Sequence, residues 1–231
     1  MKKSYVFGII ILVVLLILIL GNKQKNNSET NIVNENTIQI QGTEEKAESW
    51  REVIINEQRS LRADANGDIV AIIDGQETII YSIPGIDENE GTELFGIIKD
   101  PNYEENNYVY LTHSYKDVDG NVSLRYVCYT DTGETFINEV LLFETFDINP
   151  ENPGGILVHG TDDKVYMSVE FDTQKSYVYR MNMDGTLPDD NPISDSFWLP
   201  KTFKRISSIF IDGKELVIVD SDYEFVFDLQ S

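Results

Sequence analysis

From residue 50 onward the sequence predicts an all-β fold, and three observations support that prediction. Short runs rich in β-branched and aromatic residues alternate with turns that contain Asp, Asn or Gly. One strand–turn unit recurs at a long period. No amphipathic pattern of helical length occurs in this region. Together these observations favour stacked antiparallel sheets.

The recurring unit is a polar turn followed by alternating apolar residues. Its copies, measured from Gly67, Asn107, Asp163 and Gly213, lie 40, 56 and 50 residues apart. A β-rich repeat of about 40 to 50 residues is typical of a propeller blade, because a single four-stranded sheet cannot bury its own faces and stacks on its neighbours. Residues 50–231 are therefore expected to form a β-propeller of about four blades. A β-sandwich is the alternative, although its strands usually follow one another without a longer period.

An apolar run from Tyr5 to Leu20 precedes this region. Its 16 residues would span about 24 Å as a helix, slightly less than a hydrocarbon core of about 30 Å, and lysines at both ends can reach the interfaces. The run does not end in the small residues of a signal-peptide cleavage site. We therefore expect residues 1–21 to be an uncleaved transmembrane helix in the cell membrane, with the C-terminal domain outside the cell. Secretion after cleavage is the alternative.

The segment between the apolar run and the β-rich region is polar. Residues 22–49 are rich in Asn, Gln, Glu, Thr and Lys and contain no aromatic residue. Such a composition cannot bury enough apolar surface to fold by itself. The predicted organisation is a membrane anchor at 1–21, a disordered acidic and polar linker at 22–49, and a propeller-like domain at 50–231.

Charge limits the partners of the domain. The chain has 18 Lys and Arg against 40 Asp and Glu, a net charge of -22. Four of the lysines and none of the acids precede Glu29, so the 14 remaining basic and 40 acidic residues give -26 from residue 26 onward. Nucleic acids need positive side chains that replace counterions, so we expect no nucleic-acid partner. Cations, neutral sugars and basic proteins remain open.

Residues that mark common enzyme chemistries are scarce. The single cysteine, Cys128, excludes a disulfide within one chain, and its strand-like surroundings predict a buried free thiol. Phosphate-binding glycine loops, hydrolase nucleophile elbows and zinc-protease motifs do not occur. Composition and motifs alone therefore name no reaction.

Several stretches of the domain resemble one known family, the glucose/sorbosone dehydrogenases, which are soluble quinoprotein sugar dehydrogenases. The stretches that support the resemblance are residues 93–103, 107–111, 152–157, 162–166, 179–192 and, more weakly, 205–220. The resemblance covers roughly residues 58–220. It implies a six-bladed propeller that oxidises sugars with pyrroloquinoline quinone (PQQ) and calcium. Six blades would need about 270 residues at the observed period, so this chain is truncated relative to the family.

The sequence departs from the family where the resemblance implies catalysis. There a histidine before a Gly-Gly pair takes a proton from the sugar hydroxyl. Aligning Gly154 and Gly155 with that pair puts Asn152 in this place, and an amide cannot serve as the base. The aspartate that would orient the histidine falls on Phe171, with Asp172 one residue away. A slip of one residue turns a side chain to the other face of a strand, so Asp172 substitutes only if a bulge intervenes.

The remaining candidate residues are few. His113 and Asp172 are weak candidates for a catalytic role, and His159 is expected to pack in the core. Asp189, Asp190 and Asn191 could bind a hard cation through oxygen ligands, but a polar loop cluster of this kind is usually only solvated. The candidate ligand-binding residues are Asn152, Gly154, Gly155, Lys204 and Arg205.

Three functional hypotheses follow. The leading one is a membrane-anchored, catalytically degenerate propeller outside the cell that binds a sugar or a protein, with no catalytic residue and no cofactor. The first alternative is a PQQ-dependent aldose dehydrogenase with calcium and a rearranged site that uses His113 or Asp172. The second alternative is a structural or assembly protein that shares blades between the subunits of a homo-oligomer. An enzyme is the less favoured interpretation.

Overall fold

The computed structural model describes residues 36–39, 49–86, 91–221 and 223–229, all within the second of two units, 1–32 and 33–231. This part of the chain is all-β, as predicted. It contains fifteen strands, the 3-10 turn η1 (Ser49–Arg51) and the single-turn helix α2 (Tyr103–Asn106). None of the helices described there has the length and hydropathy needed to cross a membrane. The expected anchor at 1–21 and most of the expected linker lie outside the described residues.

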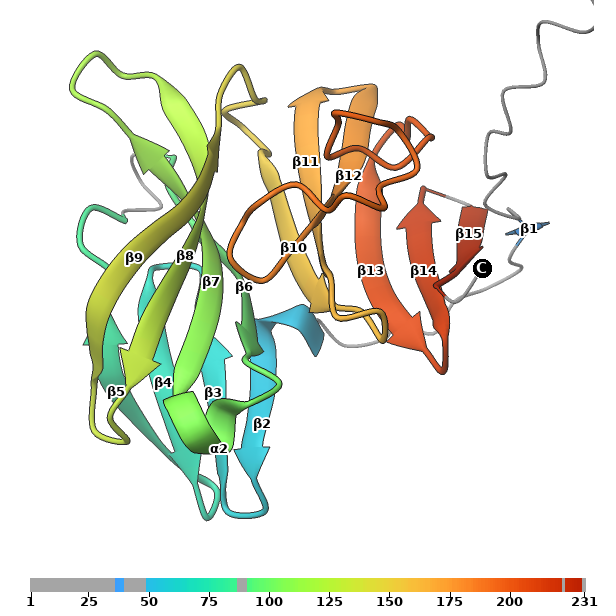
Figure 1. The fold of residues 1–231 in the computed structure, drawn as a ribbon. Helices are drawn as coiled ribbons and strands as arrows, with labels where there is room; N and C mark the ends of the chain where they lie inside the picture. Colours follow the sequence, from blue (N-terminus) through green and yellow to red (C-terminus); the bar gives the residue numbers. More distant parts are fainter. Residues whose placement is uncertain (1–35, 40–48, 87–90, 222, 230–231) are drawn as a thin grey trace, which may run out of the picture. The chain divides into compact units, whose positions relative to one another are not determined.

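The strands form four small antiparallel sheets (Figure 1). The first two sheets each have four consecutive strands. The first sheet consists of β2 (Glu52–Asn56), β3 (Arg59–Ala63), β4 (Asp68–Ile73) and β5 (Gln76–Ser82). The second consists of β6 (Leu94–Lys99), β7 (Tyr108–Lys116), β8 (Val122–Asp131) and β9 (Phe136–Thr145).

The third and fourth sheets are completed differently. The third contains β10 (Gly154–His159), β11 (Val165–Asp172) and β12 (Lys175–Met181). The fourth contains β13 (Ile206–Asp212), β14 (Glu215–Asp220), β15 (Tyr223–Asp228) and, at its outer edge, β1 (Asn36–Gln39). Strand β1 lies inside the segment expected to be a disordered tether, and its backbone partners belong to β15. A short polar segment can be ordered in this way because a sheet edge offers it hydrogen bonds.

Turn chemistry explains where the strands begin and end. The β4–β5 hairpin turns through Asp74 and Gly75, which both have positive φ, 51° and 78°, as a two-residue type I′ turn requires. The predicted repeat copies fall on β4, β7, β11 and β14. Strand β4 is the third strand of its sheet, whereas the other three are second strands. The first copy was therefore one strand out of phase, which accounts for its short spacing of 40 residues.

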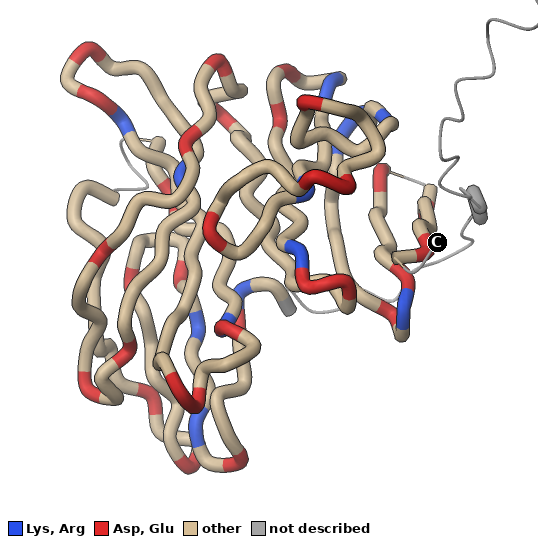
Figure 2. The backbone as a smooth tube through the Cα atoms, in the orientation of Figure 1, with Lys and Arg blue, Asp and Glu red and all other residues tan. Residues whose placement is uncertain are grey.

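The core lies between successive sheets, in three clusters of buried side chains. The first cluster joins the first and second sheets, the second joins the second and third, and the third joins the third and fourth. Strand β6 contacts both β2 and β10, and β10 also contacts β13. These four first strands therefore line the inner side of the stack. Figure 2 shows most acidic residues at turns and strand ends, outside these clusters.

A buried ion pair ties the first two sheets together. Arg59 on β3 donates to both carboxylate oxygens of Asp131, at the end of β8, with Nη2–Oδ1 at 3.0 Å. The Tyr103 hydroxyl of α2 donates to the same carboxylate at 2.6 Å. In a buried position such a pair is costly to break, because the remaining charge loses its partner. Cys128 is a buried free thiol, as predicted, and burial raises its pKa to about 11.

Candidate functional site

The glycine pair that begins β10 is required by close backbone approach. Gly154 and Gly155 have φ of +90° and +100°. A Cβ on Gly154 would lie 2.7 Å from the carbonyl oxygen of Ser168, and one on Gly155 would lie 2.6 Å from the Phe95 ring. Only glycine fits such a position without strain. The sequence marked both as ligand-binding candidates, and the structure shows a packing reason for them beside that hypothesis.

Just before this pair, the loop 149–153 is held by Glu170 of β11. The side-chain amides of Asn149 and Asn152 donate to the two Glu170 carboxylate oxygens, at 3.2 and 3.0 Å. The backbone adds two bonds, from Asn149 N to Glu170 O at 2.8 Å and from Glu170 N to Pro153 O at 3.0 Å. The carboxylate is therefore the acceptor around which this end of β10 is organised.

Burial sets the acid–base character of Glu170. The residue is only 4 % exposed, and its pKa is raised, chiefly because burial disfavours the charged form. The hydrogen bond from Asn149 and the charge of Arg205 lower this pKa, and the charge of Asp172 raises it. Glu170 can thus hold a proton closer to neutral pH than an exposed glutamate can, whereas the amide of Asn152 cannot accept one.

Lys204 and Arg205 lie at the start of β13, and both are exposed. Their backbone amides donate to the two carboxylate oxygens of Asp220, at 3.0 and 2.9 Å. These bonds fix the chain as it enters the fourth sheet. The charge of Arg205 lowers the pKa of Glu170, but among the described residues no hydrogen bond joins Lys204 or Arg205 to Asn152 or the glycine pair.

The two weak catalytic candidates lie elsewhere. His113 on β7 is buried between Leu94 and Arg125 of the neighbouring strands, its Nδ1 lies 2.9 Å from the Ser114 carbonyl oxygen, and burial lowers its pKa. Asp172 is exposed in the β11–β12 hairpin, where it accepts a bond from the Gln174 amide at 2.8 Å. Neither side chain is hydrogen-bonded to Asn152.

The loop cluster considered for a cation holds a guanidinium group. Arg180 at the end of β12 donates from Nη1 to Asp190 at 2.9 Å and to Asn191 at 2.7 Å, and from Nη2 to Asp162 at 3.0 Å. The neighbouring Asp189 is exposed. In the part of the chain that the structure describes, no group of three or more His, Cys, Asp or Glu residues could hold a metal ion.

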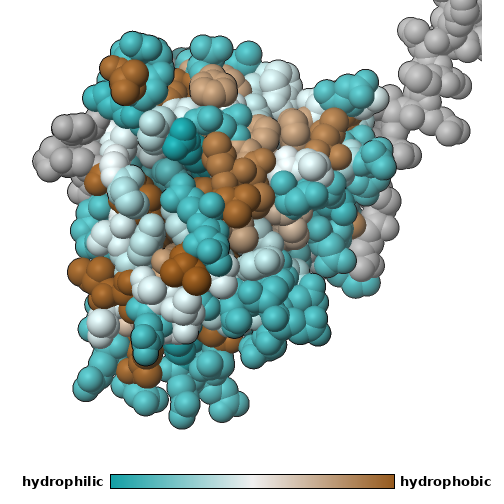
Figure 3. Space-filling model, turned by 60° about the vertical axis from the view of Figure 1, so that its left-hand side comes forward, coloured by the Kyte–Doolittle hydropathy of each residue, from teal (hydrophilic) through white to brown (hydrophobic). Residues whose placement is uncertain are grey.

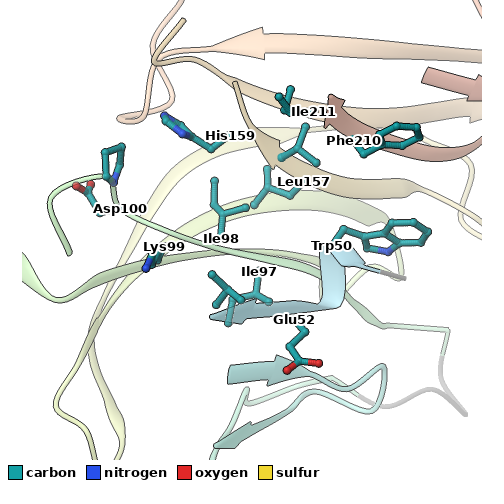
Figure 4. A pocket seen from close by; sticks show the side chains of 13 residues that line it. Trp50, Glu52, Ile97, Ile98, Lys99, Asp100, Leu157, His159, Phe210 and Ile211 are labelled. Atoms are coloured by element: carbon teal, nitrogen blue, oxygen red, sulfur yellow. The ribbon is translucent and has the colours of Figure 1, made fainter. Parts of the chain in front are cut away.

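A cavity of about 400 Å³ opens between the four innermost strands, farther along β10. Its walls are mostly aliphatic, with Trp50 and Phe210 at one end and His159 and Asp100 at the other (Figure 4). His159, expected to be a core residue, is half-buried and lines this cavity. Its Nε2 is buried and has no hydrogen-bond partner among the described residues, and burial lowers its pKa. The imidazole and the Glu170 carboxylate therefore lie toward opposite ends of β10.

Glu170 is the residue that the sequence analysis missed. The strand register shifts between Glu170 and Asp172, so the bulge required for Asp172 to replace Phe171 does exist. The carboxylate that meets Asn152, however, belongs to the residue before the aligned position. A signal was present in the sequence, because Glu170 lies between Val169 and Phe171 in a strand-like segment, and a buried charge needs a partner.

Comparison with protein families identifies one match over most of the domain. The sequence model of the family described as Glucose / Sorbosone dehydrogenase matches residues 46–203. A curated relative, quinoprotein glucose dehydrogenase B of Acinetobacter calcoaceticus, is 21 % identical over 156 residues, which are 51 % of this chain and 33 % of the relative. The chain therefore spans about a third of that relative.

Solved structures show the same fold at low identity. The PQQ-bound aldose sugar dehydrogenase of Streptomyces coelicolor has a TM-score of 0.62 and 17 % identity, over 81 % of this chain and 61 % of that one. The soluble aldose sugar dehydrogenase of Escherichia coli, in its apo form, has a TM-score of 0.59 and 13 % identity, over 80 % and 59 %. These similarities support a β-propeller-like arrangement of the four sheets.

Proposed function

Because the chain belongs to the glucose/sorbosone dehydrogenase family, we propose that it is a catalytically degenerate member, a membrane-anchored binding module displayed outside the cell. The four sheets are four consecutive propeller blades, and the innermost strands line a common channel. The ligand is a neutral sugar, held at the end of the channel where β10 begins. The apolar segment at 5–20, flanked by lysines, supports the anchor.

One observation carries this proposal, the hydrogen bond from Asn152 to Glu170. When Gly154 and Gly155 are aligned with the Gly-Gly pair of the family, position 152 corresponds to the histidine base. An amide there donates to the carboxylate but has no proton affinity near neutral pH. A carboxylate thus still meets position 152, from Glu170 and not from the aligned position 171, while the proton acceptor is lost, and this pattern supports binding without turnover.

The donor groups near Asn152 support a neutral, polyhydroxylated ligand. The Glu170 carboxylate can accept from hydroxyl groups, and the side-chain amides of Asn149 and Asn152 can donate to them and accept from them. The strongly acidic composition disfavours phosphorylated or other anionic ligands. A sugar hydroxyl that reaches Glu170 or Asn152 would exchange its bonds to water for bonds to these groups.

The fit to PQQ and calcium can be judged from the side chains present. The described residues bring together no cluster of acidic, histidine or cysteine side chains suited to a metal ion. The position that would take the proton is an amide. The described residues therefore offer neither a metal-binding cluster nor an imidazole base at position 152, and we derive no step through PQQ or calcium.

Calorimetry and a turnover assay on the same sample test the proposal. The full chain, supplied with PQQ and calcium, is expected to bind glucose saturably and to reduce no electron-accepting dye. Asn152→Ala should weaken glucose binding about ten-fold, the loss of one or two hydrogen bonds, while Asp172→Asn, at an exposed turn, should leave it unchanged. Dye reduction that depends on glucose, or a lack of any glucose binding, would overturn the proposal.

The raised pKa of Glu170 favours a second candidate function, sugar oxidation with this carboxylate as the proton acceptor. A base works best when its pKa approaches the operating pH. If this function is correct, the PQQ-loaded chain turns over glucose, and Glu170→Gln lowers that rate at least a hundred-fold while the variant still binds glucose. Turnover that survives Glu170→Gln would exclude Glu170 as the base.

A further inference from the structure

Strand β9 forms the outer edge of the second sheet and exposes apolar side chains. Ile137, Val140 and Leu141 are 43 %, 51 % and 47 % exposed. An edge strand with unpaired backbone groups and apolar side chains is a template for a further strand. Figure 3 turns the side that carries β9 toward the reader and shows hydrophobic patches among hydrophilic atoms.

The outward backbone of this strand has no partner in the part of the chain that the structure describes. The sheet order ends at β9, and none of the turn or loop backbone hydrogen bonds there involves residues 137–141. The comparable edge of the third sheet is covered, because residues 198 and 203 pair with β12. Among the described residues, the second sheet therefore differs from the third in leaving its last strand uncovered, and the first sheet likewise ends at the uncovered strand β5.

A cavity of about 390 Å³ adjoins this edge. Asn138, Val140 and Leu142, alternate residues of β9, line one side of it, and Tyr108 and Tyr110 of β7 line another. The aliphatic side chains of Val140 and Leu142 and the two tyrosine rings make its wall mainly apolar. The cavity is large enough for an aliphatic or aromatic side chain. In strand addition, backbone bonds supply affinity and a pocket for alternate side chains supplies selectivity.

The charged residues of β9 and its flanking turns are acidic, although Glu144 pairs with Arg125 and Asp131 with Arg59. Residues 131–147 contain five acids and no Lys or Arg. Glu134 and Glu139 are exposed, and so is Asp184, which lies on the rim of the cavity. A second copy of this chain would bring like charges together along the strand, which is unfavourable. The charge instead complements a basic partner.

We propose that β9 receives an extended, basic peptide segment of a partner protein as an additional strand. The peptide pairs its backbone with β9 around Val140 and Leu141, between the two register shifts of this strand, inserts an apolar side chain into the cavity beside Val140, and places Lys or Arg side chains near Glu139 and Asp184. This site lies on the outer rim of the domain and is independent of the sugar site at Asn152.

Fluorescence anisotropy of the full chain with a labelled probe peptide, four Lys-Val repeats, tests this proposal. Saturable binding is expected. Val140→Lys, which fills the cavity mouth and adds a positive charge there, should weaken the affinity at least ten-fold. Val118→Lys is the matched control, because Val118 is fully exposed in a distant turn, and it should change the affinity less than two-fold. Circular dichroism should show both variants folded.

Two further peptides separate strand pairing from simple charge attraction. A peptide of four Lys-Ser repeats lacks the apolar side chains, and a Lys-Val peptide with alternate N-methyl groups cannot pair its backbone. Both should bind at least ten-fold more weakly than the parent. Equal affinities for all three peptides, equal effects of the two lysine variants, no saturable binding, or a wild-type dimer that Val140→Lys dissociates would each overturn the proposal. Asn152→Ala should leave peptide binding intact.

Discussion

The two ends of strand β10 carry ionisable groups with opposite responses to burial. Where the strand begins, Asn152 meets the buried carboxylate of Glu170, whose pKa is raised. Where it ends, His159 lines the central cavity, and its pKa is lowered. The six residues of β10 span about 20 Å at about 3.3 Å per residue, so the two groups cannot act on one another directly.

This separation shows why residue types alone do not make an active site. An imidazole oriented by a carboxylate is the usual base for taking a proton from a hydroxyl group. This chain has both groups on neighbouring strands of the third sheet, but at opposite ends of β10. The Glu170 carboxylate accepts hydrogen bonds from Asn149 and Asn152. Among the described residues, no carboxylate is hydrogen-bonded to the His159 imidazole. The third sheet therefore lacks an assembled imidazole–carboxylate pair, and its structure is consistent with ligand binding.

The largest expected effect comes from breaking the backbone at the start of β10. Gly155→Ala should lower the free energy of unfolding by about 3 kcal/mol or more, because a Cβ at this positive φ would also overlap the Phe95 ring. Gly75→Ala is the matched control: its φ is positive but the space around it is open, so it should cost about 1 kcal/mol. Chemical denaturation measures both, and equal losses would contradict the packing argument.

A smaller effect is expected from removing the carboxylate at that end. Glu170→Ala leaves the side-chain amides of Asn149 and Asn152 without their acceptor, so it should cost about 2 kcal/mol. His159→Ala, at the other end, removes no side-chain hydrogen bond between described residues and should cost less. Thermal or denaturant unfolding of both variants at neutral pH tests this order, and a larger loss for His159→Ala would reverse the comparison.

The two ends should also respond to pH with opposite sign. Glu170 has a folded pKa above its ordinary value of 4.5, so its contribution to stability is lost as the pH rises through the folded pKa. His159 has a folded pKa below its ordinary value of 6.5, so its contribution is lost as the pH falls from there.

Glu170→Gln should therefore remove a loss seen on raising the pH, and His159→Gln a loss seen on lowering it. The measurement is the unfolding free energy of wild type and each variant across the pH range from about 4 to about 8. Differences from wild type that slope in the same direction for both variants would rule out this explanation.

The smallest effect is expected at the position that the sequence suggested for the orienting carboxylate. Asp172 is exposed and accepts one backbone bond within its hairpin. Asp172→Asn should change the unfolding free energy by less than about 0.5 kcal/mol and leave glucose affinity unaltered. A loss of glucose affinity comparable with that of Asn152→Ala would place Asp172 in the site after all.

Local patterns predicted much of the fold. Turns with glycine or left-handed Asp and Asn residues separate the strands as expected, since those residues tolerate positive φ better than most others. The pairing of β1 with β15 was not predictable, because its partner lies at the far end of the sequence and the segment has no hydrophobic pattern of its own. The sequence placed the first repeat on β4 and not on β3, because β3, Arg59–Ala63, lacks the alternating apolar pattern of β4.

The site was predicted in part, for a reason that lies in strand geometry. Asn152 and the glycine pair could be located because glycines fix an alignment. Glu170 could not, because the irregularity beyond it shifts the register by one residue, and alignment by spacing then leads to Phe171 and Asp172. The sequence suggests a cation site at Asp190 and Asn191, but the contact of Arg180 with both residues depends on the folding of the 180–191 loop and is not visible in the sequence.

The central claim is that the Glu170 carboxylate still faces position 152, although the asparagine there cannot act as a base. Proton NMR titration of the imidazoles in Asn152→His, with His113 and His159 as internal references, tests it most directly. We expect the introduced imidazole to titrate above 6.5, since a carboxylate beside it stabilises the charged form, and the two native imidazoles to titrate below. An introduced imidazole that titrates below 6.5, as the other two do, would show that the Glu170 carboxylate does not interact with the side chain at position 152.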